Sequence, residues 1–255
     1  FFEDIEEVHP GWMAAHLEEQ PLRLAGMALK SLPPRYIPKV VQAMRPDKVT
    51  WIQKELHGIN PTDFQKELLL AILARNFRPI NCLSGVSQDP FEMIYYLNGQ
   101  EMLVLVEELG VSELAMACQD LSAEDFHAIA GKLPPKMQEK IKIKLGQYER
   151  TPPERVKQAR RSFLHLQDEL YEKGRLIEFT GLFIMARALV GAPPERVLFV
   201  AHKLPPRDGG VLLKMIRRLD GEAEAEQASI SRPEIVEKIT YLAEIDRIRS
   251  LWKYF

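Results

Sequence analysis

Features that would tie a small fold together or hold it in a bilayer are scarce in this chain. Its 255 residues include two cysteines, Cys82 and Cys118, whose spacing matches no metal-binding pattern. We therefore expect no disulfide framework and a reducing, cytoplasmic location. The longest apolar stretch, residues 179–192, is interrupted by Arg187 and is shorter than the roughly 20 residues that span a bilayer. The sequence predicts no membrane span and at most a peripheral association with a membrane.

A surplus of one charge is also lacking, because the net charge is −2 at pH 7. This balance gives no general attraction to nucleic acid, although it leaves room for local patches. The histidines have no metal-ligand spacing, and a glycine-rich phosphate loop is absent. Gly209 and Gly210 lack the flanking strand and lysine of such a loop, and we interpret them as an early break in a helix. No cofactor, metal site or enzymatic activity is predicted.

Strand patterns are absent too, since apolar residues recur at helical steps nearly everywhere. In their place a Leu-Pro-Pro corner, flanked by cations, recurs at Leu32, Leu133 and Leu204. The leucine ends one helix, and the prolines break that helix and begin the next. Three such corners predict an all-α fold, an armadillo-like right-handed superhelix of tandem helical repeats.

The corners also define a register for the repeat. Leu133 and Leu204 lie 71 residues apart, and the residues around them match. A competing register of 41 residues, from Pro152 to Pro193, is interpreted as reuse of the same helix start. A stretch rich in Pro, Gly and polar residues after Asn76 predicts a boundary. We predict three domains, residues 1–80, 89–177 and 178–255.

Several local predictions depend on residues that begin or end helices. Asn60 is expected to cap a helix and Gly110 to stop one. Residues 221–226 are expected to form an exposed acidic loop, and Pro233 to begin the last helix. The helix after Asn60 is expected to bury one apolar stripe: Phe64, Leu68, Leu69, Ile72 and Leu73.

Cations gather in one region of the chain. Between Lys136 and Arg161 there are nine cations and three acids, a local balance of +6. Three interpretations stay open: a solvated helix face, a docking surface for an acidic protein, and nucleic-acid binding, which the lack of interleaved aromatics disfavours. The candidate partner-binding residues are Lys136, Lys140 and Lys144. Replacing Lys140 and Lys144 by Glu is expected to weaken partner binding and to leave helicity unchanged.

With the repeats aligned, residues 106–176 resemble the C-terminal half of FliG, the flagellar motor switch protein. The matching segments, in order and without gaps, are Val106–Leu109, Ala117–Leu121, Lys132–Met137, Val156–Arg160 and Glu172–Leu176. Near the N-terminus, His9 and Pro10 precede an apolar helix and the first corner. This arrangement is similar to the family's middle domain, which opens with EHPQ.

The resemblance implies a non-enzymatic scaffold built from FliG-like middle and C-terminal armadillo-like domains. It implies that His9 and Pro10 bind a partner and that Lys136 falls at one of the family's torque-generating charges. The other charge positions hold different residue types, which implies a divergent paralog that keeps the scaffold and docking role: Gln119, Ile143, Lys144 and Pro152.

The place of such a protein follows from the same resemblance. It implies a component of a bacterial flagellar motor or a related type III secretion assembly, at the inner-membrane face of the basal body. The implied partners are other basal-body proteins, FliM-like or FliF-like, and further copies of the chain through repeat stacking. The corners also resemble the regulatory helical domain of MgtE-type magnesium transporters, which implies the alternative of a regulatory domain attached to a transporter.

Overall fold

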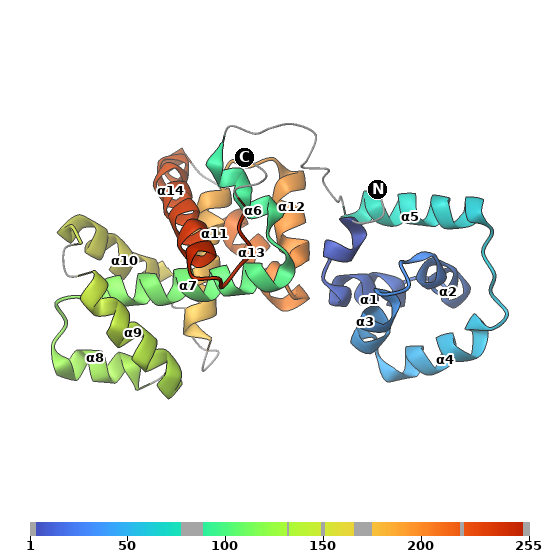
Figure 1. Ribbon diagram of the computed structural model, residues 1–255, viewed down its shortest axis with the longest axis horizontal. Coiled ribbons are helices and arrows are strands. Elements are labelled where there is room, and N and C mark those ends of the chain that lie inside the picture. The colour runs from blue at the N-terminus through green and yellow to red at the C-terminus, as the bar shows by residue number, and fades with distance from the viewer. Residues whose placement is uncertain are drawn as a thin grey trace. The chain divides into compact units, whose positions relative to one another are not determined.

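The computed structural model describes residues 4–77, 89–131, 133–148, 151–165, 175–219 and 222–251, and within these ranges the chain is helical without a strand (Figure 1). This confirms the predicted all-α class. The helices are α1 Pro10–Glu18, α2 Leu22–Ser31, α3 Ile37–Ala43, α4 Pro46–Leu56, α5 Asp63–Phe77, α6 Met93–Tyr96, α7 Gly99–Ala117, α8 Ala123–Ala130, α9 Pro135–Gln147, α10 Pro153–His165, α11 Leu176–Leu189, α12 Pro194–Lys203, α13 Pro206–Arg218 and α14 Glu222–Glu244, with 3-10 turns η1 Asp4–Glu7 and η2 Pro90–Glu92.

Contacts divide the chain into two compact units. Unit 1 consists of Phe1–Ser87, Tyr95–Gly99 and Ala192–Gly210, and unit 2 consists of Gln88–Ile94, Gln100–Gly191 and Val211–Phe255. Helix α12, which lies in the third predicted domain, therefore packs with the N-terminal helices. It does so because the backbone N–H of His9 donates to His202 O (2.7 Å) and the indole N–H of Trp12 donates to Leu204 O (3.0 Å).

The three predicted corners are present and share one design. Leu32, Leu133 and Leu204 are all buried, so each corner is anchored in a core. Leu32 and Leu204 are extended, with ψ of 157° at both, which ends α2 and α12. The lysine before the corner also recurs in its role: Lys30 donates to Ile59 O (2.5 Å), and Lys203 donates to Tyr95 O and Leu97 O. The lysine of the middle corner lies outside the described residues.

Helix bounds agree with the 71-residue register. Helices α8 and α12 begin 71 residues apart, and α9 and α13 both begin and end at that offset. The ends of α7 and α11 are capped in the same way by an arginine. Arg160 donates to the carbonyls of Ala117 and Gln119, and Arg232 donates to those of Ala188 and Val190.

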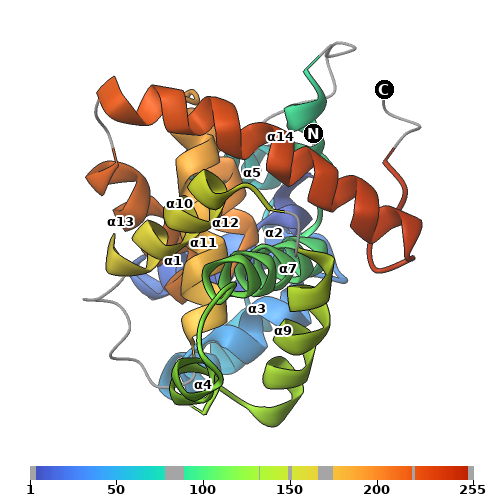
Figure 2. The same ribbon diagram turned by 90° about the vertical axis from the view of Figure 1, so that its left-hand side faces the viewer.

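The predicted stop at Gly110 is wrong, because α7 continues through it to Ala117. A Cβ on Gly110 would lie 2.0 Å from Ile177 O, and one on Gly181 would lie 1.9 Å from Val106 O. Helices α7 and α11 thus cross at backbone contact, and Figure 2 shows α7 nearly end-on against α11. Glycine is needed here for close approach, since a side chain on either helix would separate them.

Two further predictions are corrected in the later helices. Residues 222–226 are helical rather than a loop, and Pro233 lies inside α14 rather than at its start. Packing explains the correction: α14 lies across α11 (Figure 2) and buries Ile235, Ile239 and Leu242, which outweighs the hydrogen bond that the proline removes. Gly209 likewise does not break α13, and a Cβ there would lie 2.3 Å from Ala201 O.

Candidate functional site

The structure gives the three predicted lysines of α9 different environments. Lys136 is exposed and has no ion-pair partner among the described residues. Lys140 forms an ion pair with Glu107 of α7 and is partly exposed. Lys144 is buried, forms an ion pair with Glu108 and has its ammonium 4.6 Å from the centre of the Tyr241 ring. The inward lysines therefore join α9 to the rest of unit 2.

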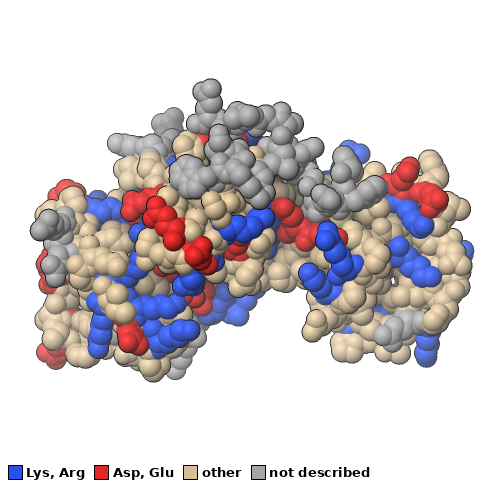
Figure 3. All heavy atoms as spheres, in the orientation of Figure 1, with Lys and Arg blue, Asp and Glu red and all other residues tan. Residues whose placement is uncertain are grey.

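The outward side of α9 carries Lys136, Lys142 and Ile143, and the Ile143 side chain is 62% exposed. Lys and Arg side chains gather over α9 and its surroundings in Figure 3. Other members of the nine-cation cluster act inside unit 2, such as Arg155 and the cap Arg160, or pair within their own helix, as Lys157 does with Glu154 (2.8 Å). The outward cationic surface is therefore smaller than the sequence suggests.

A buried polar network lies at the centre of unit 2. Glu113 of α7 is completely buried and accepts hydrogen bonds from Arg155 of α10 and from Ser162 (3.0 Å). Arg155 also pairs with Glu234 of α14 at 2.9 Å, and Arg187 of α11 reaches Ser162. Burial raises the pKa of Glu234 and lowers that of Arg187. These charges hold four helices together: α7, α10, α11 and α14.

His9 and Pro10 lie at the start of α1. The His9 ring accepts a hydrogen bond from Gly11 N (3.1 Å) and so caps the helix, which Pro10 begins. Burial lowers the pKa of His9, against the raising effect of Asp208, and burial also lowers the pKa of His202. The His202 ring packs edge-on against Trp12, with ring centres 5.1 Å apart. These residues join α1 to α12 within unit 1.

Cys118 follows α7 and is a small buried residue. Burial raises the pKa of its thiol to about 11, although the positive charge of Arg160 acts to lower that pKa. The thiol is therefore protonated and unreactive at neutral pH. Cys82 lies outside the described residues.

The residues that the sequence prediction missed are on α5. The helix is capped by a reciprocal pair of hydrogen bonds. Thr62 Oγ1 accepts from Gln65 N (3.3 Å), and Gln65 Oε1 accepts from Thr62 N (2.9 Å), so the cap is Thr62 and not Asn60.

Within the predicted buried stripe of α5, only Leu69 and Leu73 are buried. The other three side chains form an exposed surface that we call the α5 outer face: Phe64 (73% exposed), Leu68 (50%) and Ile72 (47%).

The α5 outer face arises because apolar residues surround most of the helix. The side that faces the core of unit 1 is Leu69, Leu70, Leu73, Ala74 and Phe77. Periodicity cannot choose between two apolar sides of one helix, so the sequence contained the signal only as an excess of apolar residues. Solitary exposed apolar residues are common, whereas three at successive turns of one helix make the α5 outer face a candidate binding surface.

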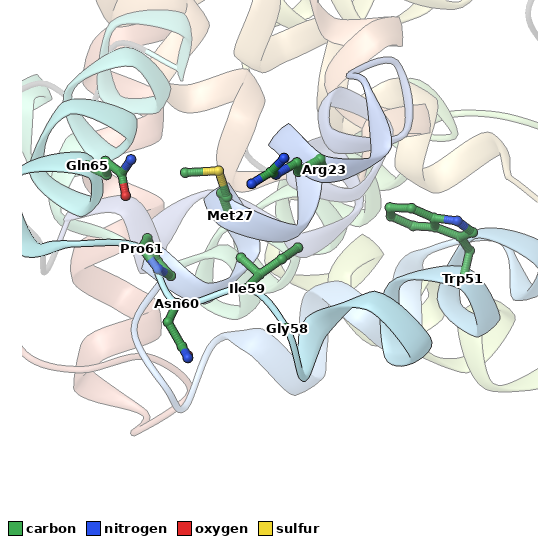
Figure 4. A pocket seen from close by; sticks show the side chains of 8 residues that line it. All are labelled: Arg23, Met27, Trp51, Gly58, Ile59, Asn60, Pro61 and Gln65. Carbon is green, nitrogen blue, oxygen red and sulfur yellow. The ribbon is translucent and has the colours of Figure 1, made fainter.

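A cavity of about 460 Å³ lies at the N-terminal end of this face, and we call it the α2–α5 cavity. Arg23 and Met27 of α2 project into it between Trp51 of α4 and Gln65 of α5 (Figure 4). Residues 58–61, which include Ile59, complete its lining. The lining combines apolar side chains with one cation and amide groups. Such a lining suits an apolar side chain that lies close to a carboxylate.

Comparisons with models of protein families, with curated proteins and with solved structures find no match to this chain. In the part of the chain that the structure describes, no helix has both the length and the apolar character needed to cross a membrane. The same residues hold no cluster of three or more His, Cys, Asp or Glu side chains that is suited to a metal ion.

Proposed function

We propose that the protein is a non-enzymatic scaffold of helical repeats that works by binding other proteins. The observation that carries this proposal is the exposure of apolar and cationic side chains along the outward faces of α5 and α9, while the charged residues that converge in unit 2 are buried in ion pairs. A helix face of this kind is a surface for another protein rather than a site for a reaction.

The finer architecture that we propose is an armadillo-like right-handed superhelix. It is supported by the three buried corner leucines and by helix bounds that agree over a 71-residue offset. In a superhelix of this type each repeat buries its apolar side against a neighbour, which leaves the outward helices for partners.

The assembly that we propose is a flagellar motor or a related type III secretion apparatus, in which the chain acts as a FliG-like component. The support for it is the resemblance of residues 106–176 and of the first corner region to that family. Its partners would be FliM-like or FliF-like basal-body proteins or further copies of the chain, and it would lie at the cytoplasmic side of the inner membrane.

Affinity capture of the tagged full chain from the organism that encodes it tests this proposal. Motor, export or basal-body proteins are expected among the captured partners, and deletion of the gene is expected to impair motility or secretion. Capture of none of them, together with intact motility and secretion in the deletion strain, would overturn the assembly role.

A further inference from the structure

The α5 outer face and the α2–α5 cavity form one continuous surface. Pro61 lies just before α5, and Gln65, Leu68 and Ile72 recur on one side of the helix at three- and four-residue steps. The first two positions, Pro61 and Gln65, line the cavity, and the last two are the exposed Leu68 and Ile72. From Phe64 to Ile72 the apolar part of α5 covers about 12 Å at 1.5 Å per residue.

Charge indicates what this surface binds. Residues 21–77 contain nine cations and four acids, a balance of +5 within a chain whose net charge is −2. The six acids of residues 1–20 offset this excess over residues 1–77 as a whole, and two of them form ion pairs, Glu6 with Arg35 and Glu18 with Arg45. The charge next to the α5 outer face therefore depends on individual cations. Arg23, on the cavity, and Arg75, one turn beyond Ile72, have no ion-pair partner among the described residues. Within the described part of the chain, the apolar face therefore has a cation without an ion-pair partner at each end.

We propose that this surface binds an acidic amphipathic helix of another protein. The partner helix lies along α5, inserts one large apolar side chain into the α2–α5 cavity against Met27 and Trp51, and places carboxylates near Arg23 and Arg75. The length of the face fits a partner helix of about three to four turns. This inference concerns unit 1 and does not depend on membership of a flagellar assembly.

The probe for the test is a synthetic, dye-labelled helical peptide with leucines at three- and four-residue steps and a central phenylalanine. Its flanks carry glutamates, and a second peptide replaces every glutamate by lysine. Binding to the full chain is followed by fluorescence anisotropy at low and high salt. The acidic peptide is expected to bind at least about tenfold more tightly than the basic one, and this preference is expected to shrink at high salt.

Variants of the chain locate the binding surface. Leu68→Ser combined with Ile72→Ser is expected to weaken binding of the acidic peptide by about tenfold or more, because both side chains are half exposed and their loss removes apolar contact area. Arg23→Glu is expected to weaken the binding of the acidic peptide and to strengthen the binding of the basic peptide. Ile143→Ser, at an exposed position of unit 2, and Lys39→Glu, at an exposed position away from the cavity, are matched controls that should bind like the parent chain.

Three results would overturn the proposal. The first is equal affinity for the acidic and basic peptides, or no binding of either. The second is unchanged binding by the Leu68→Ser, Ile72→Ser variant. The third is a dimer of the free chain in sedimentation equilibrium that this variant abolishes, because the surface would then bind a second copy of the chain.

Discussion

At the scale of single residues, the lysine before the third corner, Lys203, is a structural cation. Lys203 is almost completely buried, and its ammonium donates to Tyr95 O (2.6 Å) and Leu97 O (2.8 Å). Glu7 lies 2.6 Å away and supplies the opposite charge. A buried ammonium is tolerated only where oxygens surround it, so the corner lysine fixes the chain between α6 and α7 to α12.

Replacing this lysine should therefore destabilise unit 1. We expect Lys203→Met to lower the free energy of unfolding by about 3 kcal/mol, since two buried carbonyls lose their donor. Urea unfolding of the full chain, followed by circular dichroism, measures the change. Lys39→Met, at an exposed lysine without a partner among the described residues, is the control and should change stability by less than about 0.5 kcal/mol. Equal effects of the two variants would contradict the structural role.

The lysines of α9 make a second prediction at this scale. Lys144 is buried beside Glu108, so Lys144→Glu places two carboxylates together and should cost about 3 kcal/mol of stability. Lys136→Glu should leave stability within about 0.5 kcal/mol, because Lys136 is exposed. Thermal unfolding of both variants distinguishes the positions. An unchanged unfolding temperature of the Lys144→Glu variant would show that the ion pair with Glu108 is dispensable.

At the scale of helices, α7 and α11 of unit 2 cross at backbone contact. Each helix places a glycine against a carbonyl of the other, Gly110 against Ile177 and Gly181 against Val106. These four positions are related by the 71-residue offset, so the two copies of one helix meet through the same two positions. Reciprocal contacts of this kind are those of a local two-fold arrangement.

Alanine substitutions test the crossing. Gly110→Ala and Gly181→Ala should each destabilise unit 2 by about 3 kcal/mol, because the new methyl group would overlap a backbone oxygen that cannot move aside. Gly146→Ala in α9 has no atom within 4 Å of the new Cβ and should stabilise the chain by about 0.5–1 kcal/mol. Chemical denaturation gives all three values. Stabilisation by Gly110→Ala would mean that the helices do not cross closely.

The helices also show what sequence reasoning can reach. The starts of α1, α4, α9 and α13 follow from proline, whose effect on the backbone is local. The continuity of α7 through Gly110 and of α14 through Pro233 depends on packing against α11, which lies far away in sequence. The α5 outer face was missed for the same reason, since only the position of its neighbours decides which apolar side is buried.

At the scale of the whole chain, buried groups of the two units contribute to the pH dependence of stability with opposite signs. In unit 1, burial lowers the pKa of His9 and of His202 below 6.5. The folded unit then binds fewer protons than the unfolded chain, so its stability is greatest above pH 6.5 and falls as the pH decreases toward the lowered pKa values. In unit 2, burial raises the pKa of Glu234 above 4.5, so the contribution of that group falls as the pH rises through the raised value.

Hydrogen exchange resolved by mass spectrometry can follow both units in the intact chain. Below pH 6.5, after correction for intrinsic exchange rates, amides of α1 and α12 should lose protection relative to those of α7 and α11, because protonated His9 and His202 are poorly solvated where α1 meets α12. His202→Gln removes one titrating ring at this contact. In this variant the protection of α1 amides should depend less on pH, while the protection of α11 amides should depend on pH as in the parent chain. An equal loss of protection in α11 would place the acid sensitivity outside the two histidines and would contradict their role in joining α1 to α12.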